Sequence, residues 1–224
     1  MSEGLPPLPN ADRLPRRWPG RLLMLVTDGA RGDRSLPQVV AEAIEGGVNA
    51  VQLREKGMPA GEVLALARQL RGICGSRALL LINDRLDVAL MCGADGVHLP
   101  ENGLPVAAAR QILPPSMWVG RSVHSIRAAR QAELDGATYV LAGTVFPSRS
   151  HPETAAAGAG LLRDIQARLT IPIVGIGGID ATNIDECWRA GAAGVAVISA
   201  VMGAADPREA AASLAPMRED EECD

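Results

Sequence analysis

Eight short aliphatic runs, separated by segments of helical periodicity, constrain the fold of this sequence more than any other feature. The runs begin near Leu22, Ala50, Leu79, Gly96, Trp118, Tyr139, Pro172 and Gly194. Nearly all are bounded by Gly, Asp, Asn or Pro, as buried parallel strands are. The segments between them carry apolar residues on one face, for example Leu36, Val39, Val40, Ala43 and Ile44. The pattern predicts eight strands that alternate with one-faced helices.

Strands that alternate with helices imply right-handed βαβ units, and eight such units close most economically as a barrel. The predicted fold class is therefore α/β, a single (β/α)8 TIM barrel, with a doubly wound open sheet as the alternative. A chain of 224 residues suits one barrel domain, which needs roughly 200 to 250 residues. We place an irregular, proline-rich tail at residues 1–20, the barrel domain at 21–215 and an acidic tail at 216–224.

Charge and composition exclude several functions. The formal charge of −4 comes from residues 218–224, which hold five acids and one base, so the rest of the chain is neutral. A neutral body argues against nucleic acid and membrane as partners, although a phosphate pocket needs only backbone amides and one or two cations. The four cysteines lack metal-ligand spacing, and the absence of an apolar span or secretory segment leads us to expect a cytoplasmic protein.

In a barrel of this kind, function collects where strands end and the following loops begin. The second strand ends at Gln52, Arg54 and Lys56, for which a salt-bridged rim is the plain alternative to substrate binding. The third strand ends at Asn83 and Asp84, which either cap the next helix or belong to the site.

Two of the three histidines lie at strand ends. His98 ends the fourth strand, and Ser122 and His124 end the fifth. A histidine aimed into the mouth of the barrel is the easiest acid/base near neutral pH. We favour a functional role for His124, whereas His98 fits a functional role and a satisfied core histidine about equally.

The last three strand ends suggest a phosphate site. The sixth strand leads into a long polar loop that contains Arg149, and loops of this length often cover or bind ligands. The seventh strand ends in Gly177 and Gly178, and the eighth in Ile198 and Ser199. Barrels often hold a phosphate on backbone amides at these two ends, although tight turns alone also require glycine.

Six segments that follow one another between about residues 21 and 205 carry a resemblance. They are Gln52–Lys56, Ile82–Arg85, Ala94–Leu99, Val119–Ser125, Gly143–Pro147 and Pro172–Ile179. Together they resemble the thiamine phosphate synthase/TenI family. The resemblance implies a TIM barrel, usually a homodimer, that acts in thiamine biosynthesis on a thiazole phosphate.

The family contains two chemistries, and this chain departs from the first. Its synthases join a pyrimidine pyrophosphate to the thiazole phosphate and hold Mg²⁺ with two aspartates. The resemblance assigns one aspartate to Asp84, but Gly103 stands at the place of the second, with Glu101 and Asp87 as acids that could help. The lysine of the synthase Thr-x-Thr-Lys loop is also missing, and Arg149 could restore its charge.

The second chemistry needs neither group. TenI-type tautomerases aromatise a thiazole carboxylate phosphate tautomer by proton transfer, and the segment Ser122–Ser125 has the TenI-like form. The resemblance therefore implies that His124 is the catalytic acid/base.

We expect a TenI-like thiazole tautomerase without a cofactor. It would hold the phosphate on Gly177, Gly178, Ile198 and Ser199, and Arg54 and Lys56 would face the other substrate anions. Gln52, Asn83, His98, Ser122 and Arg149 complete the expected substrate-binding set. The first alternative is a thiamine phosphate synthase with a remodelled Mg²⁺ site at Asp84, and the second is a non-catalytic regulatory barrel that binds thiazole or thiamine phosphate.

Overall fold

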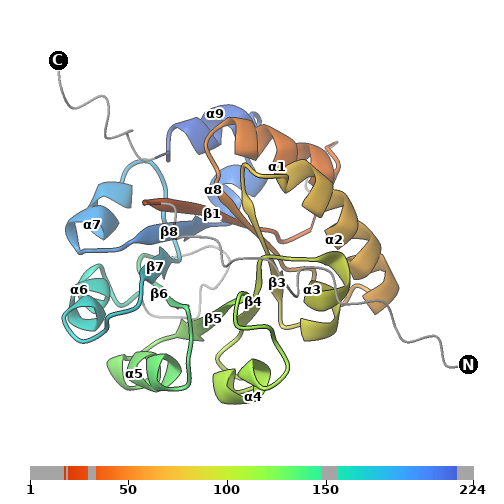
Figure 1. Cartoon of the computed structure of the whole chain (residues 1–224). Coiled ribbons are helices and arrows are strands. Elements are labelled where there is room, and N and C mark those ends of the chain that lie inside the picture. Colours follow the sequence, from red (N-terminus) through yellow and green to blue (C-terminus); the bar gives the residue numbers. More distant parts are fainter. Residues whose placement is uncertain (1–17, 19, 30–33, 148–155, 216–224) are drawn as a thin grey trace, which may run out of the picture.

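A closed barrel of eight parallel strands forms the centre of the protein, and helices surround it (Figure 1). The computed structural model describes residues 18, 20–29, 34–147 and 156–215. The strands are β1 (Leu22–Val26), β2 (Ala50–Leu53), β3 (Leu79–Asn83), β4 (Gly96–Leu99), β5 (Trp118–Val123), β6 (Tyr139–Gly143), β7 (Ile173–Ile176) and β8 (Gly194–Val197). Because β1 pairs with β8, the sheet has no free edge, which confirms the predicted (β/α)8 barrel over the open sheet.

The helices alternate with the strands in the predicted order. They are α1 (Leu36–Glu45), α2 (Ala60–Cys74), α3 (Leu86–Cys92), α4 (Val106–Arg110), α5 (Ile126–Leu134), α6 (Gly160–Gln166), α7 (Ile184–Arg189), α8 (Ser199–Met202) and α9 (Pro207–Ala212). Pro207 opens α9, since its missing N–H costs nothing in the first turn, and Asp206 caps the helix by accepting from the Glu209 amide.

Two apolar layers explain why the strands are continuously aliphatic. Leu22, Met24 and Val26 of β1 belong to a cluster inside the barrel. Leu23 and Leu25 of the same strand belong to the larger cluster between strands and helices. Successive side chains of a strand point to opposite faces, so both faces of each strand must be apolar.

Trp18 closes the amino-terminal end of the barrel, although the predicted tail includes it. Its ring stacks on Trp118, with 5.1 Å between the centroids and 5° between the planes. The indole N–H donates to the Ala193 carbonyl oxygen at 3.3 Å. Because this end is filled, the carboxyl ends of the strands are the side on which a site can open. Apart from Trp18 and Gly20, the proline-rich and acidic tails lie outside the described residues.

Candidate active site at the mouth of the barrel

A cavity of about 610 Å³ opens at the carboxyl ends of the strands. Its volume is within the usual range for small-molecule sites. The predicted residues that line it are Gln52, Arg54, Lys56, Asn83, His98, Ser122, His124, Gly177, Gly178, Ile198 and Ser199. Arg149 and His151 lie outside the described residues. The structure thus gathers residues from six strand ends around one space.

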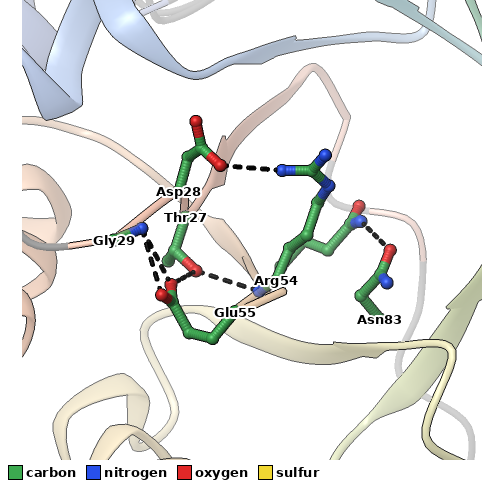
Figure 2. Close-up of polar contacts among 7 residues, drawn as sticks. Thr27, Asp28, Gly29, Arg54, Glu55 and Asn83 are labelled. Carbon is green, nitrogen blue, oxygen red and sulfur yellow. Dashed lines mark hydrogen bonds and ion pairs between the residues drawn. The ribbon is translucent and has the colours of Figure 1, made fainter. Parts of the chain in front are cut away.

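The ends of β1 and β2 form a polar network on one side of the mouth (Figure 2). Arg54 donates to an Asp28 carboxylate oxygen at 3.0 Å, and its side chain is only 15% exposed. The Glu55 carboxylate accepts from the Thr27 hydroxyl at 2.6 Å and from the Gly29 amide. The Thr27 hydroxyl in turn accepts from the Arg54 amide at 2.9 Å. This network fixes the backbone that carries Arg54.

Gln52 of β2 and Asn83 of β3 form a second polar pair. The Gln52 amide donates from Nε2 to Asn83 Oδ1 at 3.1 Å, and Gln52 is 2% exposed. Its Oε1 atom has no hydrogen-bond partner among the described residues. Buried acceptors are normally satisfied, so this oxygen suits a donor on a ligand or a water molecule in the cavity.

The helix-cap alternative for Asn83 and Asp84 is not what the structure shows. The residue before α3 is Arg85, and no side chain caps this helix. Asn83 faces Gln52 instead, and Asp84 has a left-handed backbone with φ of 61°. Such a backbone is uncommon outside glycine, and Asp is among the residues that tolerate it best.

His98 lies inside the barrel, which answers the question of its orientation. Its Nδ1 is 3.1 Å from the Tyr139 hydroxyl, and its Nε2 is 2.8 Å from the Ser122 hydroxyl. Burial, with a smaller contribution from the charge of Arg121, lowers the pKa of His98 to about 3. His98 is therefore neutral near pH 7, and we expect it to orient groups in the cavity rather than to cycle through a charged form.

This pKa predicts a loss of stability in acid. The unfolded chain binds a proton at His98 near pH 6.5, whereas the folded protein binds it only near pH 3. The free energy of unfolding should therefore fall by about 1.4 kcal/mol per pH unit from this residue as pH drops through that window. Urea unfolding between pH 7 and 4 should show a flatter pH dependence for His98→Gln than for the wild type. If the free energy of unfolding falls equally with pH in the two proteins, His98 is not the cause of the acid destabilisation.

His124 lies at the outer rim, in contact with an acid. Its Nδ1 is 2.6 Å from Oε2 of Glu101, and the two side chains are 52% and 40% exposed. Both residues line the cavity. A carboxylate at one ring nitrogen orients the imidazole and leaves the other nitrogen for a substrate. Of the two histidines among the described residues, His124 is thus the one placed for proton transfer.

Gly177 and Gly178 bring backbone into the mouth from the end of β7. Their φ angles are 103° and 64°, and side chains at these positions would collide with Thr144 and with the Pro147 carbonyl. The Asn183 side chain donates to the Gly178 carbonyl oxygen at 2.9 Å, which fixes that peptide. Ile198 and Ser199, at the start of α8, line the same cavity. Only glycine fits these two positions sterically. Because glycine has no side chain, the backbone of Gly177 and Gly178 is exposed to the cavity.

The carboxylate of Asp84 lies against the loop that follows β4. A Cβ atom on Gly103 would stand 2.8 Å from Asp84 Oδ1, so the two positions are adjacent. The acids that could help Asp84 are engaged elsewhere, because Glu101 contacts His124 and Asp87 pairs with Arg85. The hydrogen bond from Arg85 holds the pKa of Asp87 below its usual value.

Magnesium is the ion that the synthase alternative requires. Among the described residues, no group of three or more His, Cys, Asp or Glu side chains is arranged to hold a metal. Magnesium that bridges substrate phosphates needs only one or two protein carboxylates. Asp84 is not among the residues that line the cavity, but it follows Asn83, which is, so it would supply one carboxylate from the edge of the mouth.

The strand-end pattern did not single out three polar residues that line the cavity, Asn102, Thr144 and Asp180, or three others that support its walls. Thr27 and Glu55 support Arg54, and Arg121 holds the loop after β4 through the Glu101 and Leu104 carbonyl oxygens. Thr27 had a usable signal, since it is the first polar residue after the aliphatic run of β1. Arg121 lies within β5, so its position after a strand gave no comparable signal.

The fold and the mouth define a class: a TIM-barrel enzyme whose site combines glycine-rich backbone, the partly buried Arg54, the exposed Lys56 and the exposed His124. A family model described as thiamine monophosphate synthase matches residues 23–201. The chain belongs to this thiamine monophosphate synthase (TMP-TENI) family. Within the described residues, no helix has the length and apolar character that crossing a membrane requires.

Relatives of this chain carry the name of one chemistry. Thiamine-phosphate synthase from Roseiflexus castenholzii is 42% identical over 86% of this chain and 86% of its own length. That from Methanoculleus marisnigri is 45% identical and covers 86% and 92%. The solved thiamine phosphate pyrophosphorylase from Pyrococcus furiosus has a TM-score of 0.80 at 40% identity, over 86% of this chain and 93% of that one. These names favour the synthase alternative over the tautomerase that the sequence analysis prefers.

Proposed function

We propose that this enzyme is a thiamine-phosphate synthase, which joins a pyrimidine pyrophosphate to a thiazole phosphate as pyrophosphate departs. The observation that carries the proposal is the similarity to relatives of that name, at 42% and 45% identity over 86% of this chain. The catalytic function expected first, tautomerisation, becomes the second candidate. Cytoplasmic location and a homodimer stay predictions.

The residues of the mouth divide between the two substrates in this proposal. Backbone amides near Gly177, Gly178, Ile198 and Ser199 would bind the thiazole phosphate. Arg54 and Lys56, after the end of β2, would face the pyrophosphate, and Gln52, Asn83, His98 and Ser122 would orient the rings. Asp84 would hold Mg²⁺, which supplies charge neutralisation for the leaving pyrophosphate when bound.

To bind the pyrophosphate, Arg54 must exchange its ion pair with Asp28 for one with the substrate. It is paired with Asp28 in the structure, so its charge is already balanced (Figure 2). A pyrophosphate, with its higher charge, can compete with one carboxylate for the planar guanidinium fork.

One specific observation favours thiazole tautomerisation as the second candidate. The contact between His124 and Glu101 places an oriented imidazole at the cavity, and it engages an acid that could otherwise join Asp84. Proton transfer from one position of the thiazole ring to another needs only such a base, which returns the proton afterwards.

The deciding experiment offers the purified enzyme each set of substrates in Mg²⁺ and in EDTA. For the synthase we expect thiamine phosphate from thiazole phosphate and pyrimidine pyrophosphate in Mg²⁺, and none in EDTA. Conversion of the thiazole carboxylate phosphate tautomer at equal rates in Mg²⁺ and EDTA would support the second candidate. Failure to form thiamine phosphate under any metal condition would reject the synthase.

A further inference from the structure

We infer that Glu101 and Arg121 are positioning residues for His124, so that the loop after β4 orients the imidazole for proton transfer. The inference rests on the second candidate function, tautomerisation, and adds to it two residues for which the sequence suggested no such role. We define the loop as residues 100–104.

The contact between Glu101 and His124 selects one arrangement of the imidazole. The carboxylate can only accept, so Nδ1 carries the hydrogen at this 2.6 Å contact. In the neutral ring, Nε2 then carries the lone pair, and it makes no hydrogen bond to a described residue. Because both residues line the cavity, the basic nitrogen is available to a substrate there.

Arg121 fixes the other side of the loop. Its Nη1 donates to the Leu104 carbonyl oxygen at 2.7 Å, and its Nη2 donates to the Glu101 carbonyl oxygen at 2.6 Å. The rigid guanidinium fork thus grips the loop at two points. The same strand, β5, leads directly into His124. One rigid element therefore holds both the base and the loop that orients it.

The third support comes from Gly103. Its backbone N–H donates to the Pro100 carbonyl oxygen at 2.8 Å, which closes a tight turn, and it packs against the Asp84 carboxylate. The loop is therefore held along its length, and the Glu101 side chain starts from a fixed backbone.

A purely stabilising role does not explain the pair. Both side chains are about half exposed, and ion pairs with that exposure contribute little to stability. Losing the Glu101 carboxylate should therefore leave folding nearly unchanged, while an imidazole without its orienting partner should react more slowly. This separation between stability and rate makes the inference testable.

The test measures kcat, KM and thermal unfolding for aromatisation of the thiazole carboxylate phosphate tautomer. We expect kcat of Glu101→Ala to fall about 10- to 100-fold, as orienting partners of reactive groups commonly cost, with KM within about two-fold and an unchanged Tm. Glu101→Gln, which keeps an acceptor oxygen, should recover part of the loss. Arg121→Lys keeps the charge but loses the fork, so a smaller fall in kcat is expected. Glu62→Ala, an exposed acid of α2, is the matched control.

The double variant His124→Ala/Glu101→Ala gives the sharpest comparison. If Glu101 acts through His124, removing it in the absence of the imidazole should cost nothing further. Additive losses, or a Glu101→Ala enzyme with unchanged kcat, would overturn the inference while tautomerisation stands. A wild type that does not convert the tautomer would reject both.

Discussion

Under the second candidate function, tautomerisation, replacing His124 by alanine should lower kcat for aromatisation by about 10²- to 10⁴-fold, the usual contribution of a general acid/base. His98 cannot compensate, because burial lowers its pKa to about 3 and both of its ring nitrogens face hydroxyl groups of the barrel interior. Phosphate binding should stay within a few-fold, since Gly177 and Gly178 lie on another strand end. Steady-state kinetics together with calorimetric titration of thiazole phosphate would measure both quantities.

Gln69→Ala, a substitution on the exposed face of α2, controls for handling and folding. An enzyme that keeps its turnover without the imidazole would remove His124 from its role. A parallel loss of phosphate binding would mean that the substitution disturbs the whole mouth, and kcat would then no longer report on the base.

The sequence determined the barrel because one physical pattern repeats eight times. Strands buried on both faces must be aliphatic throughout, and helices that cover them must be apolar on one face. Elements such as β2 and α1 can therefore be predicted without knowing what they pack against. A glycine directly after a helical run is also a local signal, because a left-handed C-cap favours glycine. Gly93, for example, ends α3 in a left-handed conformation that other residues adopt with strain.

The site could be predicted as a set of positions but not as a set of contacts. Parallel strands all end at one edge, so polar residues after each strand gather there. Which of them touch depends on register and loop shape: His98 meets Tyr139, 41 residues away, and His124 meets Glu101, 23 residues away. Trp18 shows the same limit, since only the closed barrel creates the surface on which it stacks.

The residues that distinguish the synthase from the tautomerase lie in a small part of the mouth, around Asp84 and Gly103. Gly103 replaces an expected aspartate, and the structure places it directly against Asp84. The absent side chain would thus have completed a pair of carboxylates. The relatives' names point to the synthase, whereas this local difference points away from an ordinary synthase metal site. Asp84 is consequently the residue at which the two hypotheses make opposite predictions.

Asp84→Asn should lower kcat for Mg²⁺-dependent coupling by about 100-fold or more, because a departing pyrophosphate relies on the ion for several kcal/mol of stabilisation. Asparagine has nearly the same shape and also tolerates the left-handed φ of 61°, so the fold should be preserved. Aromatisation of the thiazole tautomer should be unchanged. Initial rates across a Mg²⁺ titration would show whether the loss is one of ion affinity.

Asp87→Asn is the matched control, because this neighbouring carboxylate pairs with Arg85 at the surface rather than with the loop after β4. Coupling by Asp84→Asn at the wild-type rate and the same Mg²⁺ requirement would show that other groups hold the ion. Loss of coupling in both variants would instead indicate a general electrostatic effect at the start of α3. Only a loss confined to Asp84 fits a synthase whose metal depends on this one carboxylate, because Glu101 contacts His124 and Asp87 pairs with Arg85.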